Sequence, residues 1–162
     1  MNSRKSVFRA VSLSKLLIAR GLAFVLTACT QEPESKPQMD WQPPAFEALD
    51  SNGEAFRYPE DLQGPTIVLF WATWCPYCKA LMPHIQSIVD EYEGEIQVVS
   101  LNFREDEDPV AFLEERGFDF RLIAEAEEIA KSWNVKGTPG LFLVDSTGRA
   151  VFSNFSIPKD AY

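Results

Sequence analysis

The chain has 162 residues, of which 46% are hydrophobic and 12% aromatic, enough to bury the core of one globular domain and too few for two. This composition excludes a disordered or fibrous protein. The formal net charge is −9, and an acidic chain is a poor partner for nucleic acid, whose phosphates attract Lys and Arg. We expect the acidic residues to form solvated faces that keep the protein soluble.

The N-terminal segment has the pattern of a secretory signal. Residues 1–28 contain five Lys or Arg and no acid, and they end in a short apolar run. Arg20 interrupts the apolar stretch, which is therefore shorter than the about 20 residues that span a bilayer. We predict an export signal over 1–28 and no permanent transmembrane helix. Its removal takes away five positive charges and changes the net charge from −9 to −14.

Cys29 directly follows this segment. The sequence LTAC over residues 26–29 resembles the lipobox of bacterial lipoproteins. The resemblance implies that Cys29 is acylated, becomes the first mature residue and anchors the protein to a membrane surface. The alternatives are a plain cleaved signal, an uncleaved anchor or a misassigned start. The rest of 29–40 is polar and contains two prolines, so we predict a flexible tether before a folded domain over 41–162.

The folded domain begins with the pattern of a hairpin, a buried strand and a long helix. Alternating runs over 45–49 and 54–58 flank an Asn-Gly turn signal and predict a β-hairpin. The apolar run over 65–71 predicts a central strand buried on both faces. Apolar residues then recur at spacings of three and four over 76–92, which predicts an amphipathic helix.

The second half of the domain continues this alternation of strands and helices. Asp108 and Pro109 have the pattern of a helix start, and Gly117 ends that helix. The predicted elements are a strand over 96–101, helices over 108–116 and 125–133, and an antiparallel strand pair over 141–145 and 150–155. Together they predict an α/β fold, in which a mixed central sheet has helices on both faces and a parallel crossover joins its first two strands.

Two of the three cysteines lie where the buried strand meets the long helix. If lipid occupies Cys29, then Cys75 and Cys78 remain as an isolated pair. A disulfide across so short a loop constrains the unfolded chain little, so structural cross-linking explains it poorly. A helix N-terminus favours the thiolate of Cys75, and Cys78 lies one turn later, near enough to attack a mixed disulfide. The pair is therefore predicted to be a redox dithiol, in which Cys75 attacks and Cys78 resolves.

The residues around the two cysteines fit this interpretation. Pro76 is tolerated because the first helical turn leaves its nitrogen unpaired in any case. Tyr77 lies between the two sulfurs and is expected to influence the redox potential of the pair. Trp74 is expected to cover the edge of the site, and the alternative is a packed aromatic side chain without such a role.

At this point the chain resembles a known family. Residues 71–78 (WATWCPYC), Pro83, and residues 135–145 followed by Gly148 resemble the thioredoxin superfamily. They are most similar to its extracytoplasmic, membrane-tethered branch, the TlpA/ResA-like thiol-disulfide oxidoreductases. The resemblance covers about residues 41–155. The combination of WCxxC with a distant Gly-Thr-Pro tripeptide (residues 137–139) before a strand is far more specific than CxxC alone.

The resemblance implies a thioredoxin-like fold and a peptide-docking element. In that family the proline that matches Pro139 is cis and faces the dithiol. Thr138 would then offer its backbone to an incoming peptide, much as a strand edge does. The alternative is an ordinary trans proline in a loop. The substrate-binding residues implied in this way are Trp74, Pro76, Tyr77, Thr138 and Pro139.

The same resemblance implies partners and a location. Members of this branch reduce disulfides of envelope proteins, for example in cytochrome c maturation, and receive electrons from a membrane thiol-disulfide transporter. No prosthetic group is implied. Thr30, which follows the lipidated cysteine, is not the Asp that retains enteric lipoproteins at the inner membrane. By analogy, we expect a periplasm-facing, lipid-anchored protein in the bacterial cell envelope, with the outer membrane favoured.

Three features depart from the family pattern. Many thioredoxins have a buried acid six residues before the first cysteine, and some tethered relatives have one six residues after it. These positions are Leu69 and Leu81 here, so neither proton relay can be carried over. The family also closes with a helix, which residues 156–162 are too short and proline-broken to form. Either the chain is a shortened form, or a partner covers the open face.

Other functions have less support in the sequence. Zinc needs about four ligands, whereas the dithiol is accompanied by one His, His84, which is expected to be a surface or packed side chain. We therefore predict no metal. The remaining alternatives are an envelope-anchored protein-binding module without redox turnover, and a more oxidising disulfide oxidase or isomerase. Exposure and acidity of Cys75 distinguish the enzyme from the binding module.

Overall fold

The structure is a computed structural model that describes residues 39, 41–92 and 94–155. The predicted signal over 1–28 and the lipidation site Cys29 lie outside the described residues, as does most of the predicted tether. These predictions are therefore not tested by the structure.

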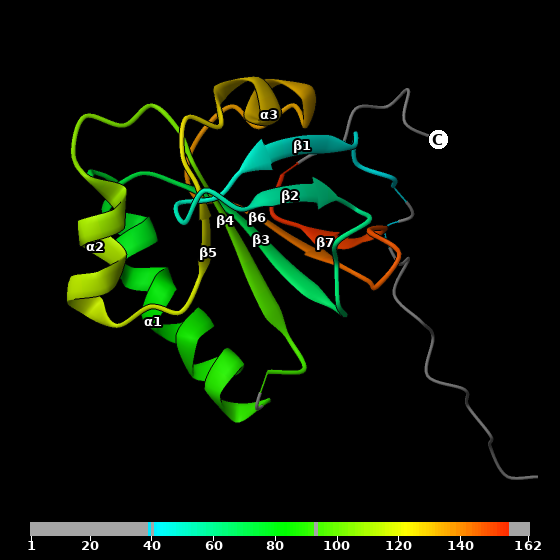
Figure 1. Ribbon diagram of the computed structural model, residues 1–162, viewed down its shortest axis with the longest axis horizontal. Coiled ribbons are helices and arrows are strands. Elements are labelled where there is room, and N and C mark those ends of the chain that lie inside the picture. Colours follow the sequence, from blue (N-terminus) through cyan, green and yellow to red (C-terminus); the bar gives the residue numbers. More distant parts are fainter. Residues whose placement is uncertain (1–38, 40, 93, 156–162) are drawn as a thin grey trace, which may run out of the picture. The chain divides into compact units, whose positions relative to one another are not determined.

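A mixed sheet of five strands, in the order β5-β4-β3-β6-β7, forms the centre of the described chain, and β1 and β2 form a separate hairpin (Figure 1). This architecture confirms the predicted α/β fold and its N-terminal hairpin. The strands are β1 (Phe46–Leu49), β2 (Ala55–Tyr58), β3 (Thr66–Trp71), β4 (Gln97–Asn102), β5 (Arg121–Ile123), β6 (Gly140–Val144) and β7 (Ala150–Ser153), and the helices are α1 (Pro76–Glu91), α2 (Pro109–Arg116) and α3 (Glu127–Ser132).

β3 is the central strand, and all six of its residues are buried. It pairs in parallel with β4 on one side and antiparallel with β6 on the other. The connection from β3 to β4 runs through α1, as predicted from the sequence. Burial on both faces explains why β3 reads as a continuous apolar run instead of an alternating one.

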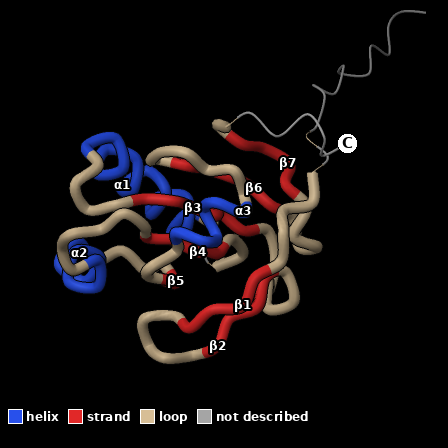
Figure 2. Tube along the Cα trace, turned by 90° about the horizontal axis from the view of Figure 1, so that it is seen from above, coloured by secondary structure: helices blue, strands red, loops and turns tan. Residues whose placement is uncertain are grey.

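The two faces of the sheet carry different layers. α1 and α2 pack on one face, where Met82 and Phe112 belong to one buried cluster. The hairpin and α3 lie on the other face, where Tyr58 and Trp133 belong to a second cluster (Figures 1 and 2). Helices therefore cover both faces, as the sequence predicted.

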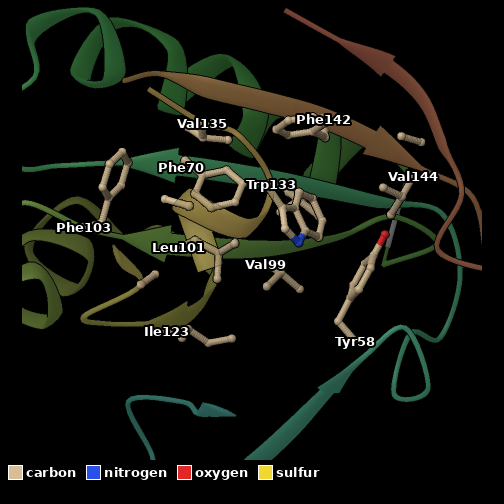
Figure 3. Close-up of a cluster of buried hydrophobic side chains, with 14 of the residues drawn as sticks. Tyr58, Phe70, Val99, Leu101, Phe103, Ile123, Trp133, Val135, Phe142 and Val144 are labelled. Atoms are coloured by element: carbon tan, nitrogen blue, oxygen red, sulfur yellow. The ribbon is translucent and has the colours of Figure 1, made fainter. Parts of the chain in front are cut away.

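Aromatic side chains dominate the second cluster (Figure 3). The rings of Tyr58 and Phe142 lie 5.0 and 5.2 Å from the ring of Trp133, in edge-on arrangements that aromatic pairs prefer. The buried Tyr58 hydroxyl donates a hydrogen bond to the carbonyl of Gly148, and burial raises the pKa of Tyr58 above its usual value. These contacts attach the hairpin to the domain through its last residue.

Two elements differ from the sequence-based expectations. β5 was not predicted, because three residues are too few to show a period, and the strand forms through pairing with β4 and burial of Leu122 and Ile123. α3 is shorter than the predicted 125–133 because Glu125 has a left-handed φ of 53°. A helix cannot continue through a residue in that conformation.

The face of the sheet beside α1 is partly open. An apolar groove lined in part by Ile67, Ile88, Tyr92 and Leu143 runs between α1 and β6. The expectation of a missing final helix concerns residues 156–162, which lie outside the described residues. Within the described ranges, no helix has both the length and the apolarity needed to cross a membrane.

Candidate active site

The two cysteines lie at the N-terminus of α1. Cys75 is the N-cap residue, with extended backbone angles of φ −78° and ψ 110°, and Pro76 is the first helical residue. An extended residue before a proline and a proline in the first turn are both favourable, so the sequence itself places the helix start here. The predicted position of Cys75 at a helix N-terminus is confirmed.

The structure joins Cys75 and Cys78 in a disulfide. The backbone N–H of Cys78 donates a hydrogen bond of 3.1 Å to Sγ of Cys75. This N–H would also face a thiolate on Cys75 after reduction, where a charge-assisted hydrogen bond lowers the pKa of a thiol. The local geometry therefore suits a stabilised thiolate on the first sulfur.

Both cysteines are buried, and the aromatic residues next to them in the sequence, Trp74 and Tyr77, form an exposed rim. Cys75 is only 2% exposed and Cys78 is fully buried, whereas Trp74 is 47% and Tyr77 76% exposed. The exposed Cys75 that the sequence analysis named as a mark of the enzyme is therefore not found in this disulfide form, in which the sulfur is covered by its surroundings. Trp74 is held in place because its indole N–H donates a 2.7 Å hydrogen bond to the carbonyl of Arg104. Trp74 is thus a fixed surface ring beside the dithiol and not a buried core residue.

The peptide bond between Thr138 and Pro139 is cis, as the resemblance implied. It immediately precedes β6, whose first residue, Gly140, pairs with Phe70 near the end of β3. Since the cysteines follow the end of β3, this register brings the two segments to the same edge of the sheet. Gly140 is needed there, because a Cβ would lie 2.9 Å from a side-chain atom of Val135.

Glu105, which lies in the loop between β4 and α2, is a site residue that was not predicted from the sequence. One carboxylate oxygen accepts from the backbone N–H of Thr73 and from the amide of Asn102, both at 2.7 Å. The other accepts from the Thr73 hydroxyl at 2.6 Å and from the backbone N–H groups of Asp106 and Glu107 at 2.9 and 3.2 Å. Partial burial opposes ionisation, but the hydrogen bonds from Thr73, Asn102 and Asp106 outweigh it and lower the pKa of Glu105 to about 2.

The neighbouring Arg104 contacts both halves of the site. Its carbonyl accepts from Trp74, and its guanidinium donates a 3.1 Å hydrogen bond to the carbonyl of Lys136, two residues before Thr138. A left-handed φ of 55° at Arg104 accompanies a 2.7 Å bond from its N–H to the carboxylate of Glu127. The β4–α2 loop, residues 103–108, thus links the segment before the dithiol to the segment before the cis proline.

The family's two acid positions hold no acid here. Leu69 is fully buried in β3, and Leu81 is partly buried against the same cluster as the cysteines. His84 is exposed on α1, as expected for a surface side chain. Among the described residues, no three His, Cys, Asp or Glu side chains lie close enough together to hold a metal ion.

Known proteins share this fold and sequence pattern. The model of the AhpC/TSA family matches residues 40–152, which is more than half of the chain. The chain belongs to the AhpC/TSA family. Within this thioredoxin-like family it is 27% identical, over 155 residues, to the thiol-disulfide oxidoreductase ResA of Bacillus anthracis, an alignment that covers 93% of this chain and 88% of the relative. It is also 29% identical over 112 residues to the thioredoxin-like protein YneN of Bacillus subtilis, covering 66% of this chain and 65% of that protein.

Solved structures of the same fold are also similar. The thioredoxin domain of a thiol-disulfide oxidoreductase from Bacteroides vulgatus superimposes with a TM-score of 0.64 at 19% identity, covering 79% of this chain and 94% of that one. StoA from Bacillus subtilis superimposes with a TM-score of 0.57 at 24% identity, covering 72% and 90%. The protein is therefore a ResA-like member of the AhpC/TSA family with a thioredoxin-like fold, and its enzyme class is oxidoreductase.

Proposed function

We propose that the protein exchanges dithiol and disulfide with protein substrates through Cys75 and Cys78. The observation that carries the proposal is the disulfide at the N-cap of α1, where the Cys78 N–H faces Sγ of Cys75. The ResA relatives are named thiol-disulfide oxidoreductases, which supports the same chemistry. The reaction uses the disulfide of the chain itself and needs no prosthetic group.

The two cysteines have different roles in this reaction. In the reduced protein the Cys75 thiolate attacks a substrate disulfide, so that one substrate sulfur leaves as a thiolate and the other forms a mixed disulfide with Cys75. The Cys78 thiolate then attacks Sγ of Cys75 and releases the second substrate sulfur. Two electrons have passed to the substrate, whose two thiolates take up protons, and the chain now has the Cys75–Cys78 disulfide seen in the structure.

The exposed rim is the proposed docking surface for the substrate. Trp74 and Tyr77 offer aromatic area next to a buried sulfur, which suits an extended peptide whose own disulfide must reach Cys75. Thr138 would pair with the peptide backbone, and Pro139 and Pro76 would border the sulfur. Each of these residues lies at the edge of the sheet where β3 ends and β6 begins.

The direction of electron flow and the location follow from the resemblance to the tethered branch. We propose that the protein reduces disulfides of envelope proteins, including those met in cytochrome c maturation, and that a membrane thiol-disulfide transporter supplies its electrons. Lipid on Cys29 would hold it at the periplasmic face of the outer membrane. Labelling with radioactive palmitate, followed by membrane fractionation, tests this: Cys29→Ala should abolish the label and release the protein from membranes.

Redox titration tests the central proposal. The full chain carrying Cys29→Ser, so that only the dithiol reacts, is equilibrated in glutathione and dithiothreitol buffers. We expect a reversible two-electron couple more reducing than glutathione, and we expect Cys78→Ser to trap mixed disulfides through Cys75. A more oxidising couple would favour an oxidase or isomerase. The absence of a reversible couple would overturn the enzyme in favour of a protein-binding module.

A further inference from the structure

Glu105 has no part in the exchange reaction described above, yet its carboxylate is the most heavily hydrogen-bonded acidic group near the dithiol. All five of its donors are uncharged, and two of them come from Thr73, two residues before Cys75. A carboxylate that gathers so many donors is ionised at any physiological pH, in agreement with its pKa of about 2. It is therefore a fixed anion attached to the segment that leads into the active-site helix.

The segment held by Glu105 determines where Cys75 lies. Glu105 binds both the N–H and the hydroxyl of Thr73, and the carbonyl of Arg104 binds the next side chain, that of Trp74. The backbone N–H of Cys75 in turn donates a 3.1 Å hydrogen bond to the carbonyl of Ala72. Three consecutive residues before the dithiol are thus fixed, two of them by the β4–α2 loop.

The pattern of donors requires a carboxylate and not an amide. In a glutamine, one of the two oxygens becomes an NH₂ group, which cannot accept from a backbone N–H. If the NH₂ replaces the first oxygen, it faces the N–H of Thr73. If it replaces the second, it faces the N–H groups of Asp106 and Glu107. Asn102 can turn its amide to present Oδ1, which has no hydrogen-bond partner among the described residues, but the backbone donors cannot adapt.

We propose that Glu105 is a positioning residue of the dithiol: its carboxylate holds Thr73, so that Cys75 occupies the N-cap of α1 with the Cys78 N–H directed at its sulfur. The proposal rests on the proposed function, because it concerns the thiolate that starts the exchange. Glu105 acts through Thr73 and touches neither substrate nor sulfur in this scheme.

The sign of the change in the Cys75 pKa tests the proposal. Removal of a nearby negative charge by itself lowers the pKa of a thiol, because the thiolate is then less repelled. Loss of positioning has the opposite effect, because the thiolate loses its helix N-terminus and its hydrogen bond. Glu105→Gln is therefore expected to raise the Cys75 pKa and to slow alkylation at neutral pH by roughly three- to tenfold.

The measurement is the rate of iodoacetamide alkylation of Cys75 against pH, in the reduced full chain with Cys29→Ser. Glu107→Gln is the matched control, because it removes the same charge from an exposed side chain of the same loop. It is expected to change the rate less than about twofold. If Glu105→Gln does not fold, Thr73→Val, which removes one donor, is used, and a smaller rise in the pKa is expected.

Each outcome of the alkylation experiment either supports or overturns the positioning role of Glu105. A raised Cys75 pKa in Glu105→Gln with an unchanged value in Glu107→Gln supports positioning. A lowered or unchanged pKa in Glu105→Gln overturns it and leaves the proposed function intact. A Cys75 thiol that is not alkylated at any pH in the unsubstituted reduced protein instead contradicts the proposed function, because the attacking sulfur is then unreactive, and removes the basis for the inference with it.

Discussion

Glu105 should also make the stability of the protein depend on pH. Its pKa falls from 4.5 to about 2 on folding, which for a fully shielded group would correspond to about 3 kcal/mol. Glu105 is only partly buried, so solvent screening reduces the effect and we expect about 1–2 kcal/mol. Because the folded-state pKa is the lower one, this stabilisation is fully present above about pH 5 and is lost as the pH falls toward 2.

Urea unfolding of the unsubstituted protein and of Glu105→Gln, at neutral pH and at about pH 3, measures this effect. The free energies of unfolding should differ by about 1–2 kcal/mol at neutral pH, and the difference should shrink in acid. Asp61 and Asp145 also have lowered pKa values, but they are present in both proteins and cancel in the comparison. A difference that stays constant with pH would refute the reasoning, because an amide cannot reproduce a loss that depends on protonation.

Three further predictions concern the core. Gly148→Ala should lower the free energy of unfolding by about 2–3 kcal/mol, because φ is 78° and a Cβ would collide with Pro59. Gly53→Ala is the control, since Gly53 has a similar φ of 80° but open space around it, and it should cost about 1 kcal/mol. Equal losses in urea unfolding would contradict this prediction. Tyr58→Phe should cost about 0.5–1.5 kcal/mol in the same assay, since it removes one of the two donors to the carbonyl of Gly148 and leaves only the side-chain amide of Gln42, and an unchanged midpoint would contradict it. Met82→Ala, in the same buried cluster as the two cysteines, should cost about 2–5 kcal/mol by opening a cavity, and thermal unfolding should show a loss several times larger than for Leu49→Ala at an exposed strand position.

Local sequence patterns predicted most of the helices and strands of the fold. The N-cap Asp108 accepts hydrogen bonds from two backbone N–H groups of α2, and Gly117 ends that helix in the left-handed conformation, both as the sequence indicated. The Asn-Gly signal placed the hairpin turn correctly, and the strand pairing follows from alternation. β5 could not be found in this way, because its three residues become a strand only when β4 is beside them.

The site was predictable only where its residues lie together in the sequence. The cysteine pair and its helix form one local pattern, and the cis proline came from the resemblance. Glu105 lies 32 residues from Thr73 and gains its partners only through tertiary structure. One signal was available: Asn102 and Glu105 are polar residues at the end of a buried strand, where a parallel sheet gathers functional loops.

The topology explains why these distant segments meet. β3 and β4 are parallel neighbours, so the loops that follow them, one carrying the dithiol and the other carrying Glu105, leave the sheet at the same edge. β6 is antiparallel to β3, so its beginning, with the cis proline before it, lies at that edge too. Arg104, which lies in the loop with Glu105, contacts Trp74 just before the dithiol and Lys136 just before the cis proline, so it links all three segments. A dithiol motif alone would place two sulfurs on a helix, whereas this order of strands brings the cis-proline segment and the β4–α2 loop to the same edge of the sheet as the dithiol.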